Sequence, residues 1–234
     1  MKRTSAVLGF LALLLLAGCT GGVVSDQALQ ESASYEWDTD ATVTVTAGDD
    51  TYQAVYDLEN QSEVELFHRD DLGGENPLPI RAIQFRYPNG TVVNASAMTV
   101  DESDRRTVVT MPQSEGKFAY TAEYRAGEMF IPVGASGNYE VILPPGARIG
   151  VPVIGAAEPA GYDKTIRNDR VHVEWGNPAD DAITISYYFQ RDLYIFAGLL
   201  GVLALLTVIG LAYFRLQIGS LKSEREAEET DVEP

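Results

Sequence analysis

Two histidines and a large excess of carboxylates are the residues of this sequence that could carry out acid–base or metal chemistry. His68 and His172 lie far apart along the chain, and neither has a cysteine or a second histidine at ligand spacing. Zinc sites need such a cluster, so we expect no metal. His68 shares the alternation of Val64 and Leu66, which favours a histidine at the edge of a core over a catalytic base.

Serines, glycines and acidic pairs also lack the spacing that catalysis or ion binding requires. Gly134-Ala135-Ser136-Gly137 departs from the G-x-S-x-G nucleophile elbow, and no Gly-rich phosphate loop precedes a helix. Acidic pairs such as Asp49/Asp50 do not fit the calcium-loop pattern D-x-[DN]-x-[DN]-G. We therefore predict no catalytic, cofactor-binding or metal-binding residues, no cofactor, and a protein that is not an enzyme.

The only cysteine, Cys19, ends an N-terminal segment that is organised like an export signal. Lys2 and Arg3 precede an apolar run from Ala6 to Ala17, which suits a signal sequence and is short for a membrane span. The run ends in Leu16-Ala17-Gly18-Cys19, which resembles the lipobox of exported lipoproteins. The resemblance implies that residues 1–18 are removed and that lipid is attached to Cys19. An ordinary signal peptide is the alternative.

A second apolar segment, Leu193 to Phe214, contains 22 residues without a charge. A helix of this length measures about 33 Å, enough to cross a hydrocarbon core of about 30 Å. Three basic residues fall within the first eleven positions of the tail at 215–234, whereas Arg191 is the only basic residue among the twenty before the helix. The positive-inside rule therefore predicts a single-pass cell-membrane protein with a cytoplasmic C-terminus and an extracellular ectodomain.

The overall charge bears on both partners and environment. Asp and Glu total 34 against 17 Lys and Arg, which gives a formal net charge of −17. Nucleic acid is therefore excluded as a partner, because phosphate binding needs a positive face. The basic residues are 13 Arg and only 4 Lys. This composition is similar to that of proteins from halophilic archaea, which work in molar salt, where the screening length is about 3 Å.

The exported region itself reads as β structure. Residues 19–34 are small and polar and predict a flexible, lipid-attached linker. Beyond them, apolar and polar residues alternate in runs such as 63–66, 171–175 and 183–189, which is typical of strands with one buried face. We predict a mainly β region of one or two antiparallel, Ig-like β-sandwich domains, at 35–112 and 113–190. A single larger β domain is the alternative.

Three N-x-[ST] sequons lie in this exported region, at Asn60, Asn89 and Asn94. Each falls at a predicted turn or strand end, where a glycan could remain in solvent. All three are therefore candidate N-glycosylation sites.

The complete arrangement resembles a haloarchaeal family of membrane proteins of unknown function. The resemblance rests on the acidic strand-rich ectodomain, the lipobox, and the segment Tyr187–Tyr194 that runs directly into the apolar helix. It implies location and architecture, and it carries over no functional residue.

Two classes of function remain open. The first is a non-catalytic cell-surface binding or scaffold module of unknown specificity, held in the membrane and serving a protein partner in the cell envelope. The alternative is an extracellular, membrane-tethered, hydrolase-like enzyme with a site on its loops. We favour the first class, because the second needs a convergent acid–base or nucleophile cluster, which the sequence does not contain.

Overall fold

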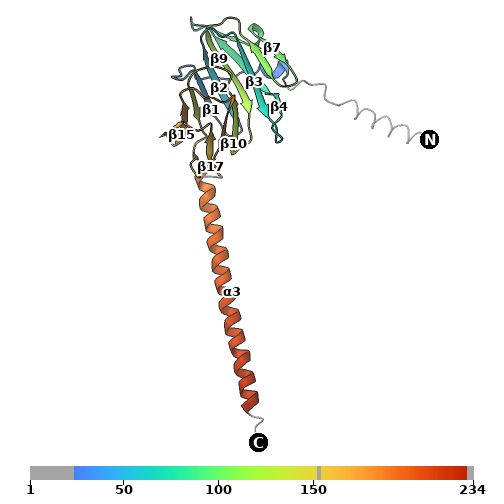
Figure 1. Cartoon of the computed structure of the whole chain (residues 1–234), viewed down its shortest axis with the longest axis vertical. Helices are drawn as coiled ribbons and strands as arrows, with labels where there is room; N and C mark the ends of the chain where they lie inside the picture. The colour runs from blue at the N-terminus through green and yellow to red at the C-terminus, as the bar shows by residue number, and fades with distance from the viewer. Residues whose placement is uncertain (1–23, 152–153, 231–234) are drawn as a thin grey trace, which may run out of the picture. The chain divides into compact units, whose positions relative to one another are not determined.

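The structure is a computed structural model that describes residues 24–151 and 154–230 (Figure 1). The chain divides into two compact units between Tyr187 and Tyr188. We call the first, as far as it is described, the β unit. The second unit contains a short strand, β17 (Tyr188–Phe189), and a long helix, α3 (Gln190–Thr230).

The β unit begins with one helical turn, α2 (Asp26–Leu29), and continues almost entirely in strands. Its strands are β1 (Val43–Ala47), β2 (Thr51–Leu58), β3 (Glu63–Arg69), β4 (Glu75–Pro77), β5 (Ile80–Arg86), β6 (Val92–Asn94), β7 (Thr99–Glu102), β8 (Thr107–Thr110), β9 (Gly116–Glu123), β10 (Glu128–Pro132), β11 (Tyr139–Ile142), β12 (Ala147–Arg148), β13 (Ala156–Glu158), β14 (Asp163–Arg167), β15 (Arg170–Trp175) and β16 (Ala182–Ser186). Between β6 and β7 lies a 3₁₀ turn, η1 (Ala95–Ala97). The mainly β prediction is confirmed.

The largest sheet has eight strands in the order β14-β15-β11-β1-β2-β9-β5-β6. It mixes strands from both sides of residue 112, and β9 pairs with β2 along its whole length, from Glu123 opposite Thr51 to Gly116 opposite Leu58. Segments 35–112 and 113–190 therefore share one sheet within one compact unit, the arrangement expected for the single larger β domain that the sequence left as the alternative. The alternation of residues predicts which face of a strand is buried, but it does not predict which strand lies beside it.

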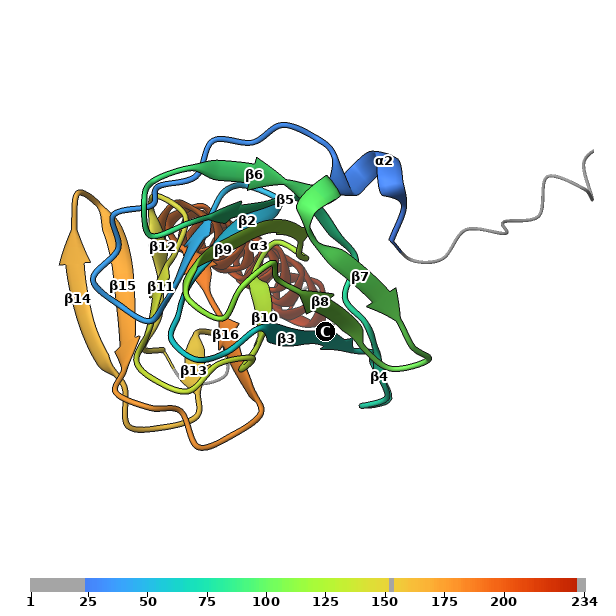
Figure 2. The ribbon, with the colours of Figure 1, turned by 90° about the horizontal axis from the view of Figure 1, so that it is seen from above.

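The core lies between this sheet and two smaller sheets, β10-β16-β13 and β4-β3-β8-β7 (Figure 2). Tyr56 of β2 donates a hydrogen bond across the layers to the Pro132 carbonyl of β10, at 3.4 Å. Tyr52 and Tyr120 are also fully buried, and their rings pack at 6.0 Å between centroids. One strand pair in the large sheet, β1 with β11, is parallel.

The segment before β1 crosses the outer face of the large sheet. Tyr35 is buried against Val55 and Ala119, and its hydroxyl donates to the Ala82 carbonyl at 2.7 Å. Leu29 of α2 is buried as well. The linker predicted over 19–34 is therefore corrected in its described part, because apolar side chains attach this segment to the sheet.

The helix α3 carries the predicted apolar segment. From Gln190 to Arg215 it is long and apolar enough to cross a membrane, and its best window has a mean hydropathy of 2.6. No residue of that window is buried within the structure. A helix that is apolar on all sides and uncovered by protein is typical of a membrane span.

Candidate functional site

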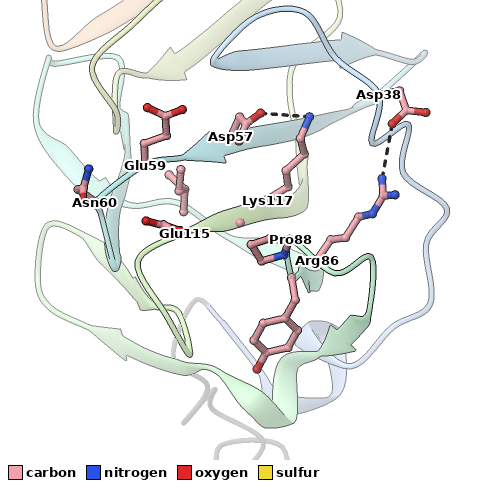
Figure 3. A pocket seen from close by; sticks show the side chains of 11 residues that line it. Asp38, Asp57, Glu59, Asn60, Arg86, Pro88, Glu115 and Lys117 are labelled. Carbon is pink, nitrogen blue, oxygen red and sulfur yellow. Dashed lines mark ion pairs between the residues drawn. The ribbon is translucent and has the colours of Figure 1, made fainter.

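A pocket of about 530 Å³ lies where β2 and β5 end and β9 begins (Figure 3). Its volume falls within the range of small-molecule sites, but its lining is mostly polar. The charged residues of the lining are Asp38, Asp57, Glu59, Arg86, Glu115 and Lys117. We call this the charged pocket.

Adjacent strands position the cations of the charged pocket. Lys117 of β9 lies opposite Asp57 of β2 on one side and Arg86 of β5 on the other. Two cations at directly opposed positions would repel each other, and each is instead paired with a carboxylate. Lys117 Nζ lies 3.2 Å from Asp57 Oδ2, and Arg86 Nη1 lies 3.6 Å from Asp38 Oδ1 (Figure 3).

Two further carboxylates border the charged pocket and form no ion pair with a described cation. Glu59 and Glu115 are both exposed, and no ion pair neutralises either of them within the part of the chain that the structure describes. Gly116, which follows Glu115 and lies opposite Leu58, has a φ of +143°, and a Cβ atom there would lie 2.6 Å from the Phe85 ring. A glycine is therefore required for β9 to begin here.

The chemistry that this arrangement supports is electrostatic recognition. Four carboxylates face two cations, so the lining favours a ligand that carries positive charge or hydroxyl groups. Across residues 24–151 and 154–230, no group of three or more His, Cys, Asp or Glu side chains could hold a metal ion.

A second pocket, of about 720 Å³, lies beside the β3–β4 hairpin and includes His68 and Asp70 in its lining. The backbone N–H groups of Gly74 and Leu72 donate to Asp70 Oδ1 at 2.7 and 3.0 Å. These hydrogen bonds stabilise the charged form and lower the pKa of Asp70. A carboxylate held in this way shapes the hairpin and is a poor general base.

The other histidine belongs to a cross-strand network. His172 Nδ1 of β15 lies 2.8 Å from Glu140 Oε1 of β11. Arg167 of β14 approaches the same Glu140 oxygen at 3.7 Å and pairs with Glu174 at 2.8 Å. None of these four side chains is a nucleophile that a His–Glu pair would activate, so the arrangement is one of neighbouring strands held by charge.

The three sequons are all at the surface, in different local geometries. Asn60 is exposed, follows β2 with a φ of +59°, and lines the charged pocket. Asn89 accepts a hydrogen bond from the Thr91 backbone at 2.9 Å, within a turn. Asn94 accepts from the Ser96 backbone and hydroxyl at 3.2 and 2.7 Å. Cys19 lies outside the described residues.

The charged pocket and Tyr187, the last residue of the β unit, lie at opposite ends of the large sheet. The Tyr124 and Tyr187 hydroxyls are 3.0 Å apart, and the Tyr124 backbone donates to the Asp50 carbonyl, just before Thr51. The pocket lies at Leu58, the other end of β2. Strand geometry separates the two ends by about 23 Å. We call them the Tyr187 end and the pocket end.

Sequence reasoning did not find the charged pocket. Asp57 and Lys117 are sixty positions apart, and only the pairing of β2 with β9 brings them together. Each residue alone resembles many other charged positions on strands of this acidic chain.

Comparison with known proteins assigns no activity to the chain. No curated protein matches the chain. The model of a family of unknown function, DUF5803, matches residues 37–233, which include most of the β unit and all of α3. The chain therefore belongs to the DUF5803 family, a family of unknown function.

Proposed function

We propose that the protein is a non-catalytic cell-surface module, anchored in the cell membrane by α3 and exposing the β unit outside the cell. One observation carries this proposal. The apolar stretch of α3 begins at Gln190, three residues after the β unit ends at Tyr187, and no protein covers it in the described chain. A membrane is the environment that suits such a helix.

Charge near the helix ends supports the orientation. The residues after α3's apolar stretch are richer in Lys and Arg than those before it, which favours a cytoplasmic C-terminus. The N-terminal signal and the lipobox at Cys19 support export and lipid attachment. The acidic composition supports an archaeal, halophilic source.

The charged pocket supports a binding role. It lies at the pocket end, away from the residue that leads into the membrane span, and a partner outside the cell could reach it. Glu59 and Glu115 offer charges that no group of the described chain neutralises. We propose a protein of the cell envelope, presenting basic groups, as the partner.

Topology is tested with single cysteines in full-length protein that carries Cys19→Ser. Ser103 is exposed in the β unit, and Ser223 lies in the C-terminal tail. We expect a membrane-impermeant maleimide to label Ser103→Cys in intact cells, and Ser223→Cys only after lysis. The reverse pattern would contradict the proposed orientation.

The binding role is tested by isolating the full-length protein from membranes in high salt. A partner that co-purifies with the natural chain should be lost on Glu59→Lys, which reverses a charge of the pocket. Asp104→Lys, at an exposed position in the β7–β8 connection, is the matched control and should retain the partner. Equal retention by both variants would remove the charged pocket from the proposal.

We also propose N-glycosylation at Asn60, Asn89 and Asn94. Intact mass of protein from the native host, compared with Asn→Gln at each position, would reveal which sites are occupied. A glycan on Asn60 would occupy the charged pocket. Its presence would therefore contradict the proposal that a partner binds in this pocket, and it would leave the proposed membrane anchoring unaffected.

A further inference from the structure

Large apolar side chains are exposed at only a few places in the described β unit: Leu72, Val92, Val151, Ile154 and Ile166. Leu72 lies in the β3–β4 hairpin between carboxylates, and Val92 lies on the edge strand β6 at the pocket end. The remaining three lie together at the Tyr187 end, as strand register and hydrogen bonds show. We call Val151, Ile154 and Ile166 the apolar patch.

Register places Val151 and Ile154. Ala156, the first residue of β13, lies opposite Ser186, the last residue of β16, in an antiparallel pair. The residues just before Ala156 therefore continue in the same direction as the chain leaving Ser186 for Tyr187. The Gly150 backbone donates to the Gly155 carbonyl at 2.8 Å and the Ile154 backbone to the Val151 carbonyl at 3.3 Å, so Val151 and Ile154 lie close together at this end.

Ile166 reaches the same end from β14. It lies opposite Val171 of β15, and the neighbouring Arg170 donates to the Ala47 carbonyl, just before the β1–β2 turn at the Tyr187 end. Lys164 alternates with Ile166 on one face of β14, and its Nζ lies 3.4 Å from the Ile149 carbonyl. This face of β14 is therefore turned toward the loop that carries Val151 and Ile154.

The chain limits how far this end can be from the bilayer. Only two residues lie between Tyr187 and Gln190, where the apolar helix begins, so an extended connection of three Cα–Cα steps spans about 10 Å. Apolar side chains at a membrane surface sink about 5–10 Å into the boundary between headgroups and acyl chains. The apolar patch shares this end of the sheet with Tyr187 and reaches that boundary when the strands stand upright on the bilayer, whereas Val92 lies about 23 Å farther along the sheet.

We propose that the apolar patch rests in the headgroup region of the bilayer that α3 spans, so that the β unit has a second contact with the lipid. This inference rests on the membrane anchoring proposed above. Attraction between charges would not hold the patch there, because Asp49 and Asp50 lie in the adjoining turn at the same end. Apolar burial supplies the contact, and the long Lys164 side chain can keep its ammonium group in the headgroup region.

The contact has a consequence for the charged pocket. A β unit held by both α3 and the apolar patch cannot turn its pocket end toward the bilayer. The charged pocket then keeps facing away from the bilayer, where partners outside the cell can bind it.

The test uses full-length Cys19→Ser protein in phosphatidylcholine vesicles, with one added cysteine that carries an environment-sensitive dye. Ile154→Cys reports on the patch, and Val92→Cys is the matched control, because the two side chains are 44% and 46% exposed. We expect a blue shift at position 154, with quenching by spin-labelled lipid, and neither effect at position 92. Ile166→Cys should behave like Ile154→Cys.

Each other outcome overturns a defined part of the proposal. Equal, water-like signals at 154, 166 and 92 would show that the patch does not touch lipid. A blue shift at 154 without lipid quenching would show that protein, such as a second copy, covers the patch. Protein that fails to float with the vesicles would contradict the membrane anchoring itself. Equal thermal midpoints of the labelled variants check that each has folded.

Discussion

Large apolar side chains are buried in the β unit and exposed along the helix α3. In β2 and β9, Tyr52, Tyr56, Phe118 and Tyr120 are each 1% exposed or less. In α3, the large apolar residues from Leu193 to Phe214 are between 43% and 66% exposed. Strands hide one face by pairing two layers, whereas a lone helix with apolar residues on every side has no such face to hide. The difference shows that α3 leaves uncovered the kind of apolar surface that the strands bury, and that it is long and apolar enough to cross a membrane.

Removing the helix should have the largest effect, because α3 is the proposed membrane span and its loss should lower the fraction of protein bound to membranes. Deletion of residues 193–234 should leave a protein held only by lipid on Cys19, which is a far weaker anchor than a membrane span. Combining the deletion with Cys19→Ser should release the protein into the medium. The measurement is the fraction of protein in the membrane pellet.

Cys19→Ser alone is the control, and it should remain in the membrane through α3. If the truncated chain with Cys19 intact is released although its signal is cleaved, Cys19 carries no lipid.

Salt should strongly affect the β unit and leave the membrane span unchanged. With a net charge of −17 for the whole chain, repulsion between exposed carboxylates is strong in dilute salt and is screened in molar salt. We expect the thermal midpoint of the full-length protein in detergent to rise from about 0.1 M to about 3 M salt. A flat midpoint over this range would contradict adaptation to high salt.

The buried tyrosines allow the core to be tested with matched substitutions. Among the described residues, the buried Tyr120 hydroxyl makes no hydrogen bond of normal geometry and interacts only weakly with the Tyr52 and Tyr56 hydroxyls, whereas the Tyr139 hydroxyl donates to the Ala135 carbonyl at 2.8 Å. Tyr120→Phe should therefore raise the free energy of unfolding, by about 1 kcal/mol or more. Tyr139→Phe should lower it by about 1 kcal/mol.

Chemical denaturation of both variants measures these changes. Destabilisation by both substitutions to the same extent would mean that Tyr120 has a partner, such as a buried water molecule.

Alkaline pH should destabilise the β unit through its buried tyrosines, of which Tyr35 is one. Burial raises the pKa of Tyr35 to about 12, although its hydrogen bond with Thr121 acts in the opposite direction. An unfolded tyrosine loses its proton near its ordinary pKa of 10.0, so the stability present below pH 10 should fall as the pH rises toward 12. Tyr35→Phe should flatten this fall in a series of denaturation curves. An unchanged slope would show that other groups cause it.

The strands could be predicted from the sequence, whereas the charged pocket could not. The alternation of Val171, Val173 and Trp175 is a local property, and β15 forms there with those three residues buried. The charged pocket depends on pairs that meet only after folding, such as Arg86 with Asp38 and Lys117 with Asp57. No local pattern marks such residues, because exposed charges on strands are common in an acidic chain.

The sequence by itself determined the class of structure of each part. Twenty-two uncharged residues predict a helix long and apolar enough to cross a membrane, and period-two alternation predicts strands with one covered face. Only the tertiary structure decided that β2 lies beside β9, that β1 pairs in parallel with β11, and that segments 35–112 and 113–190 share one sheet within one compact unit. The physical reason is that burial is a property of each residue with its near neighbours, whereas strand partners are chosen among distant segments by the packing of the whole core.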